Sequence, residues 1–472
     1  MNSDFILSFR PNILLVWNAQ SRVMILKTND WKITLENLKV GWQSALNILA
    51  TRGATLSSLN QLIDESEGSY GKIKFYYFLQ KVIKRGGICH SVHTNGRSFA
   101  TSIPLILEYQ FAECHAEINQ KFVISRFAYC HKLENNMFLE CPLATAHIIL
   151  YDWRSAAIIA LLASPIDCKD INEQISQISL ETTQKFLSLL LSLKFIVLVQ
   201  EDGRSKEESD LSLEQWEFHD LVFHCRSRKG RHMYPLGGTY RFRNKIGSLP
   251  AVKPVMSNEV IDLYKPNIKN LKATESAFTN ILESRKSIRQ YASDPLTAQQ
   301  LGEFLYRSAR LKSIIKTERG DISNRPYPSG GAIYELELYT VINICEDMVS
   351  GIYHYNPASH QLHKLADKTE VLERLLKDAY LASNKQCLPQ VLIVITARFQ
   401  RISWKYESIA YSLILKNVGV LYQTMYLVAT AMEIAPCALG TGNSDLFAKA
   451  AGINYLVETS VGEFAIGSKI IG

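Results

Sequence analysis

The sequence contains no C-x-x-C pair, although it carries nine cysteines. Without such a pair, zinc-ribbon and thioredoxin-type chemistry have little support. An odd number of cysteines at irregular spacing also does not form a disulfide framework. We therefore expect reduced thiols in a cytoplasmic protein.

The sequence also lacks the marks of a secreted or membrane protein. Its first residues, MNSDFILSFRPNILLVW, place Asp4 and Arg10 among apolar residues, unlike a signal peptide. The longest apolar stretch, residues 409–434, is interrupted by Lys416, Asn417, Gln423 and Glu433. We expect this stretch to form a buried helix and not a membrane span.

No strand-like segment is followed by G-x-G-x-x-G, so a Rossmann nicotinamide domain is not indicated. The net charge of +7 on 472 residues is mildly basic, which suits an acidic ligand or nucleic acid but demonstrates neither. An apolar content of 47% predicts a folded chain. The length predicts roughly two to four domains.

Two segments of the first half share one order of elements, and each predicts a winged helix. The first reads RVMILK, VGWQSALNILATRG, TLSSLNQLIDE and YYFLQKVIKRGGICHSVH, and the second HIILYD, WRSAAIIALLASP, DINEQISQ and TTQKFLSLLLSLKFIVLVQED. We assign these domains to residues 1–110 and 111–205, each ending in a strand hairpin. Such a unit binds DNA through a basic third helix or a peptide by strand addition. Basic residues are unevenly divided between the two segments, so both alternatives stay open. The first segment has Lys72, Lys74, Lys81, Lys84 and Arg85, and the second has mainly Lys185 and Lys194.

A polar run, residues 201–215, predicts a boundary, and residues 206–270 are expected to be a linker or wrapping segment. Its histidines do not have the spacing of metal ligands. Residues 271–472 alternate helix-like and strand-like stretches, among them a half-buried strand at 334–343 and a buried strand at 391–397. This pattern predicts a mixed sheet covered by helices, in the α+β class.

Positive charge is concentrated at RKSIRQY, residues 285–291. On a helix, Arg285 and Arg289 would point the same way, with Ser287 between them as a neutral donor. Guanidinium groups match phosphate oxygens well, and Lys469 near the end of the chain offers a further cation. A solvated helix end is the alternative, and the pattern alone does not decide between the two.

Two glycine-containing loops would let the backbone approach a flat ligand. One is RPYPSGGAIYELEL, with Pro328, Ser329 and Gly330, and the other is APCALGTGNSD, with Leu439 and Gly440 after the long helix. Main-chain N–H groups in such loops can bond to ring atoms. Most turns of this kind only connect elements.

Taken in order, these motifs resemble those of FMN-dependent nitroreductase-like proteins. The chain is more closely similar to the azoline dehydrogenases of ribosomal-peptide pathways, the streptolysin-S, microcin and cyanobactin oxidase group. WEFHDLVFHCRSRKGRH and GIYHYNPASHQLHKL resemble its linker and hairpin, and the two repeats resemble its peptide-clamp modules. The resemblance implies a nitroreductase fold and a homodimer with FMN at the subunit interface. The implied FMN contacts are Arg285, Ser287, Arg289 and Lys469 for the phosphate and ribityl chain, Pro328, Ser329, Gly330, Leu439 and Gly440 for the ring, and Gln423 on the long helix.

The same resemblance marks Lys405 and Tyr406, in RISWKYESIAYSL, as a catalytic pair. Azoline oxidation removes a proton and a hydride from a thiazoline or oxazoline ring. A lysine can take the proton once burial or a neighbouring cation lowers its pKa, and a tyrosine can relay it. Because successive helix residues point about 100° apart, we expect the pair near the start of the long helix. Without the resemblance, an exposed Lys-Tyr at a helix start is the simpler interpretation.

The sequence therefore predicts a cytoplasmic FMN-dependent oxidase that acts on a heterocyclised precursor peptide, with molecular oxygen as the final acceptor. The cyclodehydratase of the same pathway is an expected partner, whereas nucleic acid and membranes are not. Two alternatives remain. An NAD(P)H-dependent nitro- or quinone reductase would not need the N-terminal repeats, and a winged-helix DNA-binding regulator carrying a flavin domain would bind duplex DNA in a salt-dependent way.

Overall fold

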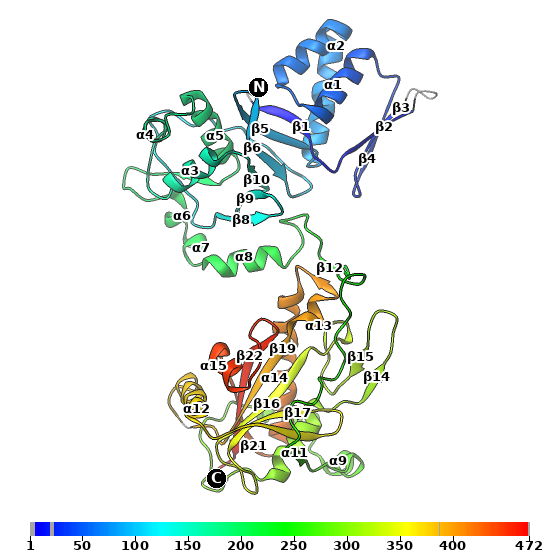
Figure 1. The fold of residues 1–472 in the computed structure, drawn as a ribbon, viewed down its shortest axis with the longest axis vertical. Helices are drawn as coiled ribbons and strands as arrows, with labels where there is room; N and C mark the ends of the chain where they lie inside the picture. The colour runs from blue at the N-terminus through cyan, green and yellow to red at the C-terminus, as the bar shows by residue number, and fades with distance from the viewer. Residues whose placement is uncertain (1–4, 19–22, 387, 471–472) are drawn as a thin grey trace. The chain divides into compact units, whose positions relative to one another are not determined.

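The computed structural model describes residues 5–18, 23–386 and 388–470 of the chain. The chain divides into two compact units, residues 1–234 and 235–472 (Figure 1). Each unit has its own hydrophobic cores.

The first part of the first unit is a winged helix, as predicted. Its elements are β1 (Ile6–Phe9), β2 (Leu14–Asn18), β3 (Val23–Lys27), β4 (Lys32–Glu36), α1 (Val40–Thr51), α2 (Leu56–Lys84), β5 (Ile88–Thr94) and β6 (Arg97–Pro104). Helix α2 is interrupted at Gly68, whose φ of 68° only glycine adopts readily. Three helical segments therefore precede the β5–β6 hairpin.

The second part repeats the three helices, but its terminal hairpin is much shorter than that of the first part. Its elements are β7 (Phe122–Ile124), β8 (Tyr129–Leu133), β9 (Asn136–Glu140), β10 (Ala146–Leu150), α3 (Trp153–Leu161), α4 (Cys168–Gln174), α5 (Leu180–Ser192) and β11 (Ile196–Leu198). Strand β11 pairs antiparallel with β7, which lies far upstream, and the predicted hairpin is reduced to one antiparallel bridge between Val199 and Ser205. Phe122 and Ile196 are buried in one core, and this packing, which periodicity does not reveal, selects the partner strand.

One sheet joins the two repeats. Its strand order is β1-β5-β6-β10-β9-β8, and β6 of the first repeat pairs with β10 of the second. The core beneath it takes Phe99 from the first repeat and Ile148 from the second. The domain boundary predicted between residues 110 and 111 remains a prediction, and the shared sheet contains strands from both sides of it.

The polar run at 201–215 is not a free linker. It forms α6 (Lys206–Ser209) and α7 (Leu211–Glu214), and α8 (Phe218–Arg226) follows. Glu207 is buried and accepts a hydrogen bond from Ser125 Oγ at 2.7 Å, which fixes the run to the first unit. The predicted wrapping segment is thus divided between the two units at Tyr234 and Pro235.

The second unit is built on a seven-stranded sheet with the order β13-β18-β17-β16-β19-β22-β21. Its strands are β13 (Val260–Asp262), β16 (Leu336–Ile342), β17 (Gly351–Asn356), β18 (Gln361–Asp367), β19 (Val391–Arg398), β21 (Ile434–Leu439) and β22 (Glu458–Ser468). Each pairing within it is antiparallel. Figure 1 shows these strands side by side.

Helices cover both faces of this sheet, which gives three layers. One face is covered by α11 (Ala298–Ala309) and α14 (Ala410–Ala431), and the other by α12 (Glu370–Ala382) and α15 (Ser444–Ala450). The remaining helices of this unit are α9 (Ile268–Thr274), α10 (Phe278–Ser284) and α13 (Phe399–Ser403). Along β19, Ile393 and Ile395 pack in the core under α11 and α14, whereas Leu392 and Val394 pack under α12 and α15. This alternation follows from the two-residue period of a strand.

Two predictions about this unit are wrong. Strand β16 was expected to be half-buried, but all seven of its residues are buried, because helices lie on both sides. The residues directly after the long helix were expected to form a glycine-containing loop, but residues 434–439 form the edge strand β21. Pro436 is tolerated there because an edge strand leaves one side of its backbone unpaired. None of the helices in the described residues combines the length and apolar character needed to cross a membrane.

Candidate active site

The charged heptapeptide at residues 285–291 is extended and not helical. Helix α10 ends at Ser284, and the chain then follows the free edge of β21. Ile288 N donates to the Pro436 carbonyl at 2.8 Å, and Ala292 N donates to the Ser468 carbonyl at 3.2 Å. The proposed helical alignment of the two arginines is therefore incorrect.

Tyr426 of α14 connects the heptapeptide to the sheet edge. Its hydroxyl lies 2.7 Å from Ser287 Oγ and accepts a hydrogen bond from Ala438 N at 2.8 Å. The guanidinium of Arg285 lies over its ring, 5.2 Å from the centroid. Arg285 and Ser287 thus share one tyrosine as their support.

The cations in this corner have no carboxylate partner within the described residues. Burial raises the pKa of the Cys437 thiol, and the charge of Arg289 beside it offsets part of that rise. Lys469 directly follows β22 and is exposed. Arg285, Arg289 and Lys469 appear in none of the ion pairs of the described chain, so they remain available to an anion. Such cations around a serine hydroxyl form a donor set suited to a phosphate.

The loop carrying Ser329 and Gly330 is fixed from inside the protein. Gly330 N donates to Asn417 Oδ1 at 3.1 Å, and Asn417 Nδ2 donates to Ser329 Oγ at 3.2 Å and to Glu335 Oε1 at 2.8 Å. The Ser329 hydroxyl also accepts from Tyr334 N at 3.0 Å. The Ser329 side chain is therefore committed to the loop itself, and Pro328 beside it is exposed.

Asn417 is the residue that the sequence reasoning missed. It is buried on α14 among Ile414, Val418 and Leu421, which face the core. The available signal was a polar side chain at a core-facing position of an apolar helix. Gln423, assigned to the flavin by resemblance, is exposed on the same helix and is not brought to the loop within this chain.

Lys405 and Tyr406 reach the same loop from 74 residues away. Lys405 Nζ donates to the Gly331 carbonyl at 3.3 Å. A Cβ atom at Gly331 would overlap both Lys405 Nζ and the Tyr406 hydroxyl. The pair does not begin the long helix, as was predicted, but lies in the turn between α13 and α14, where Tyr406 opens the short strand β20 (Tyr406–Glu407).

A second segment supports this turn from behind. Strand β12 (Gly237–Gly238) pairs with β20, and Tyr240 N donates to the Lys405 carbonyl at 3.1 Å. Trp404 Nε1 donates to the Ile246 carbonyl at 2.6 Å. The backbone of the Lys-Tyr pair is therefore held by the wrapping segment, and its side chains remain directed to Gly331.

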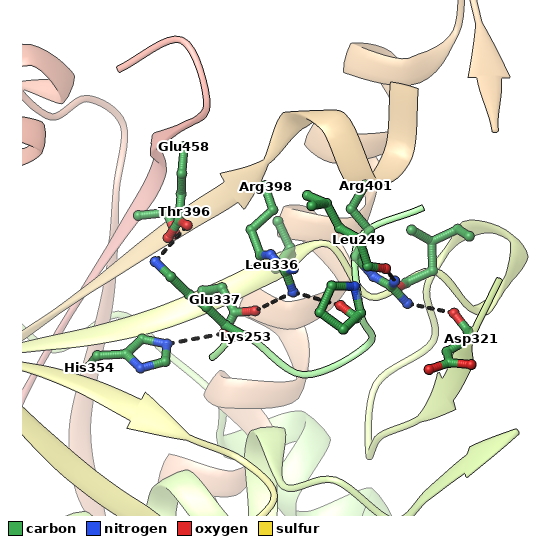
Figure 2. A network of polar contacts seen from close by, with 12 residues as sticks. Leu249, Lys253, Asp321, Leu336, Glu337, His354, Thr396, Arg398, Arg401 and Glu458 are labelled. Atoms are coloured by element: carbon green, nitrogen blue, oxygen red, sulfur yellow. Dashed lines mark hydrogen bonds and ion pairs between the residues drawn. The ribbon is translucent and has the colours of Figure 1, made fainter. Parts of the chain in front are cut away.

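Buried charges anchor the elements around the turn (Figure 2). Arg401 of α13 donates to the carbonyls of Ile333 and Leu249, each at 2.6 Å, and to that of Asp321 at 2.9 Å. Burial lowers the pKa of Arg401 to about 10, and the nearby positive charge of Arg398 adds to this.

A second buried group lies beside it, centred on Glu337. Its carboxylate lies 3.2 Å from His354 Nε2 and 3.3 Å from Arg398 Nη1. Burial alone would raise the pKa of Glu337, but the hydrogen bond and charge of His354, with the neighbouring arginines, lower it to about 2. Lys253, from the wrapping segment, donates to Glu458 on β22 at 2.7 Å. These charges fix strands and loops to one another (Figure 2).

The second glycine loop is less closely packed. Leu439 is buried in the core under α12 and α15, so only its backbone is available to a ligand. A Cβ at Gly440 would meet open space. Across the described chain, no group of three His, Cys, Asp or Glu side chains is placed to hold a metal ion.

Three family models match successive parts of the chain. The ThcOx helix-turn-helix domain matches residues 1–113, the cyanobactin oxidase ThcOx matches residues 122–233, and the nitroreductase family matches residues 282–468. The α+β fold with an N-terminal helix-turn-helix domain and a C-terminal nitroreductase fold is thereby confirmed.

The chain is also similar to individual proteins. The microcin B17-processing protein McbC of Escherichia coli is 34% identical over 110 residues, which span 22% of this chain and 40% of McbC. MJ1384 of Methanocaldococcus jannaschii, named as a nitroreductase, is 25% identical over 185 residues, 39% of this chain and 85% of that protein. A chain of the E. coli microcin synthetase McbBCD complex with truncated pro-MccB17 bound has 17% identity, a TM-score of 0.35, and coverage of 54% of this chain and 92% of its own. Residues 282–468 thus carry a nitroreductase-family domain, and the two segments before it match models of the cyanobactin oxidase ThcOx.

Proposed function

We propose that this oxidoreductase is an FMN-dependent azoline oxidase, which converts thiazoline or oxazoline rings of a precursor peptide to thiazoles or oxazoles. One observation carries the proposal. Lys405 Nζ, 74 residues along the chain, and the Tyr406 hydroxyl meet at Gly331, next to the Ser329–Gly330 loop that is proposed to face the flavin ring. A small-molecule reductase has no need of a proton-accepting pair at this position.

The residues present fit FMN. Arg285, Ser287, Arg289 and Lys469 would hold the phosphate and ribityl chain, because they combine cations without carboxylate partners in the described chain with a hydroxyl donor. Pro328 to Gly330 would lie against one side of the ring, and the backbone of Leu439 and Gly440 against the other. Bound FMN would supply the hydride acceptor, with molecular oxygen as the final acceptor. We further propose a homodimer, in which Gln423 on the exposed face of α14 meets the cofactor of the partner.

The protein itself has to remove a proton from the ring carbon that was the α-carbon of the cyclised residue. Lys405 Nζ and the Tyr406 hydroxyl are the polar side-chain groups beside Gly331. One of them takes the proton, and the other holds the ring in place by a hydrogen bond. One proton and one hydride leave for each ring, so the balance needs no further reactant.

The support behind the pair serves this chemistry. A base has to lie within hydrogen-bonding reach of the proton that it removes. The β12–β20 pairing and the hydrogen bond from Tyr240 N fix the Lys405 backbone, so only side-chain torsions remain free to adjust. The two helix-turn-helix modules are proposed to dock the precursor peptide, and the cyclodehydratase of the same pathway is the proposed supplier of the azoline.

The test is mass spectrometry of an azoline peptide after incubation with FMN-loaded protein. The wild-type protein should make the peptide lighter by two hydrogens for each ring, and Lys405→Ala should lose this activity while it still binds FMN. Lys377→Ala, an exposed lysine on α12, is the matched control and should keep full activity. An unchanged turnover by Lys405→Ala would refute the assignment of the pair.

The same preparation distinguishes the alternative reductase. Consumption of NADPH with a quinone, together with no change in the azoline peptide, would favour an NAD(P)H-dependent reductase. A protein that is colourless after incubation with excess FMN would refute both enzyme hypotheses.

A further inference from the structure

We propose that Asn417 and Glu335 are positioning residues, which hold the Ser329–Gly331 loop in the conformation that both the flavin ring and Lys405 require. The inference rests on the proposed function. It adds two residues that neither the motifs nor the resemblance assigned, and it replaces Gln423 as the α14 residue that acts on this loop within the chain.

The hydrogen bonds of this cluster form a closed set. An asparagine amide has two N–H donors and one carbonyl acceptor. Asn417 uses both donors, to Ser329 Oγ and Glu335 Oε1, and its carbonyl oxygen accepts from Gly330 N. The amide orientation is therefore fixed, because a flipped amide would direct its nitrogen at the Gly330 N–H.

The Ser329 hydroxyl is saturated as well. It accepts from Tyr334 N and from Asn417 Nδ2, and it donates to Glu335 Oε2 at 3.4 Å. A hydroxyl oxygen has two acceptor positions, and both are occupied. The Glu335 side chain accepts from both neighbours, through Oε2 from Ser329 Oγ and through Oε1 from Asn417 Nδ2.

Glu335 is fully buried and forms no ion pair within the described part of the chain. A buried carboxylate without a cationic partner is unfavourable unless hydrogen bonds compensate. Glu335 accepts one hydrogen bond from Ser329 in the loop and one from Asn417, which holds the loop, so a requirement of the loop explains this buried position better than stability alone.

The loop itself needs such support. Gly331, Ala332 and Tyr334 all have positive φ values, of 64°, 56° and 49°. Two of these residues are not glycine, so the backbone is strained and the surrounding structure has to hold it. Asn417 fixes the N–H of Gly330, and the next residue, Gly331, provides the carbonyl that Lys405 Nζ contacts. Movement of the loop would therefore change the position of the base relative to the ring-binding backbone.

The experiment compares Asn417→Ala with Asn356→Ala. Asn356 is also a buried asparagine of the second unit, and its Oδ1 accepts from Ala358 N and Ser359 N in the β17–β18 turn. Both variants lose hydrogen bonds and should lose stability to a similar extent. Only Asn417→Ala should weaken FMN binding, as measured by quenching of flavin fluorescence. The expected loss is about ten-fold in affinity, which corresponds to the free energy of about one hydrogen bond.

Hydrogen exchange gives a readout that does not depend on the flavin. In the FMN-free protein, Asn417→Ala should speed exchange at the amides of Gly330 and Tyr334, whereas Asn356→Ala should not. Glu335→Ala should behave like Asn417→Ala, and the double variant should be no worse than either single variant, because the two residues act as one unit. Glu335→Gln keeps an acceptor for Asn417 and should give a smaller loss than Glu335→Ala.

Each outcome has one meaning. If the wild-type protein binds no FMN, the proposed function fails and this inference fails with it. If the wild-type protein binds FMN, but Asn417→Ala matches Asn356→Ala in affinity and in exchange at the loop, only the inference is overturned. Additive losses in the double variant would likewise contradict a single positioning unit.

Discussion

Substitution of Gly331 by alanine tests the active-site geometry most directly. Gly331 has a φ of 64°, and a Cβ atom there would overlap Lys405 Nζ and the Tyr406 hydroxyl. Both clashing atoms are the far ends of flexible side chains. The clash is therefore expected to displace these side chains and to leave the fold in place.

The effect divides into two parts of different size. An alanine in the left-handed region destabilises a protein by about 1 to 2 kcal/mol. Displacement of a catalytic group by about 1 Å lowers turnover by about a hundred-fold. Gly331→Ala should therefore lose little more stability than the backbone strain explains, and should lose nearly all of its dehydrogenation activity.

Gly452 provides a control with the same backbone conformation. Its φ is also 64°, but a Cβ there would meet nothing within 4 Å. Gly452→Ala should show the same loss of stability in the denaturant transition of the second unit and should keep normal turnover. The assay is the loss of two hydrogens from an azoline peptide, followed over time by mass spectrometry. If the two variants had equal activity, Gly331 would not be the meeting point of the catalytic pair.

Two further predictions concern charge. Arg289→Ala should weaken FMN binding by about ten- to a hundred-fold, because a hydrogen bond to a charged group contributes about 1.5 to 3 kcal/mol. Arg374→Ala, at an exposed position of α12, is the control and should leave FMN binding unchanged. If fluorescence titration gave equal affinities for the two variants, Arg289 would not belong to the proposed phosphate site. The pKa of Glu337 is lowered from 4.5 to about 2, so its carboxylate stabilises the fold above pH 4.5 and this contribution is lost as the pH falls through 2. Glu337→Gln should therefore lower the free energy of unfolding at pH 7 by on the order of 3 kcal/mol. It should also make hydrogen exchange in β16 less dependent on acid pH. An unchanged pH dependence would contradict the lowered pKa of Glu337.

The fold could be predicted from the sequence where hydrophobic periods and turn residues specify local structure. The three helical segments of the first repeat, the β17–β18 hairpin and the buried strand β19 all follow from such patterns. Strand partners do not follow, because a strand's period says nothing about its neighbour. For that reason the β11–β7 pairing and the sheet shared by both repeats were found only in the structure.

The motifs predicted which residues come together at the site, but not which helix, strand or turn carries each of them. Arg285 and Ser287 do contact a common support, although on an extended segment and through Tyr426, and not on a helix face. Lys405 and Tyr406 do meet the glycine loop, but from a turn and not from a helix start. Asn417 was missed because its contribution depends on contacts with residues more than 80 positions away.

The wrapping segment holds the backbone of the Lys405–Tyr406 turn, and the Gly331 loop contacts its side chains, so several irregular segments meet where charged residues are buried. Irregular segments leave carbonyl groups without partners in strands or helices, and a buried carbonyl has to be satisfied. Arg401 satisfies three of them at once, in the wrapping segment, in the β14–β15 hairpin (Ser313–Ile315 and Ile322–Asn324) and at Ile333, two residues beyond Gly331. A neutral side chain has too few donors for this task, whereas a guanidinium has five in a fixed plane. Lys405 follows Arg401 by four residues, and both side chains donate to carbonyls of one loop. Arg401 Nε donates to the Ile333 carbonyl and Lys405 Nζ to the Gly331 carbonyl. The Lys405 side of this contact is therefore set within a short stretch of chain, whereas the loop side is held by Asn417 of the long helix.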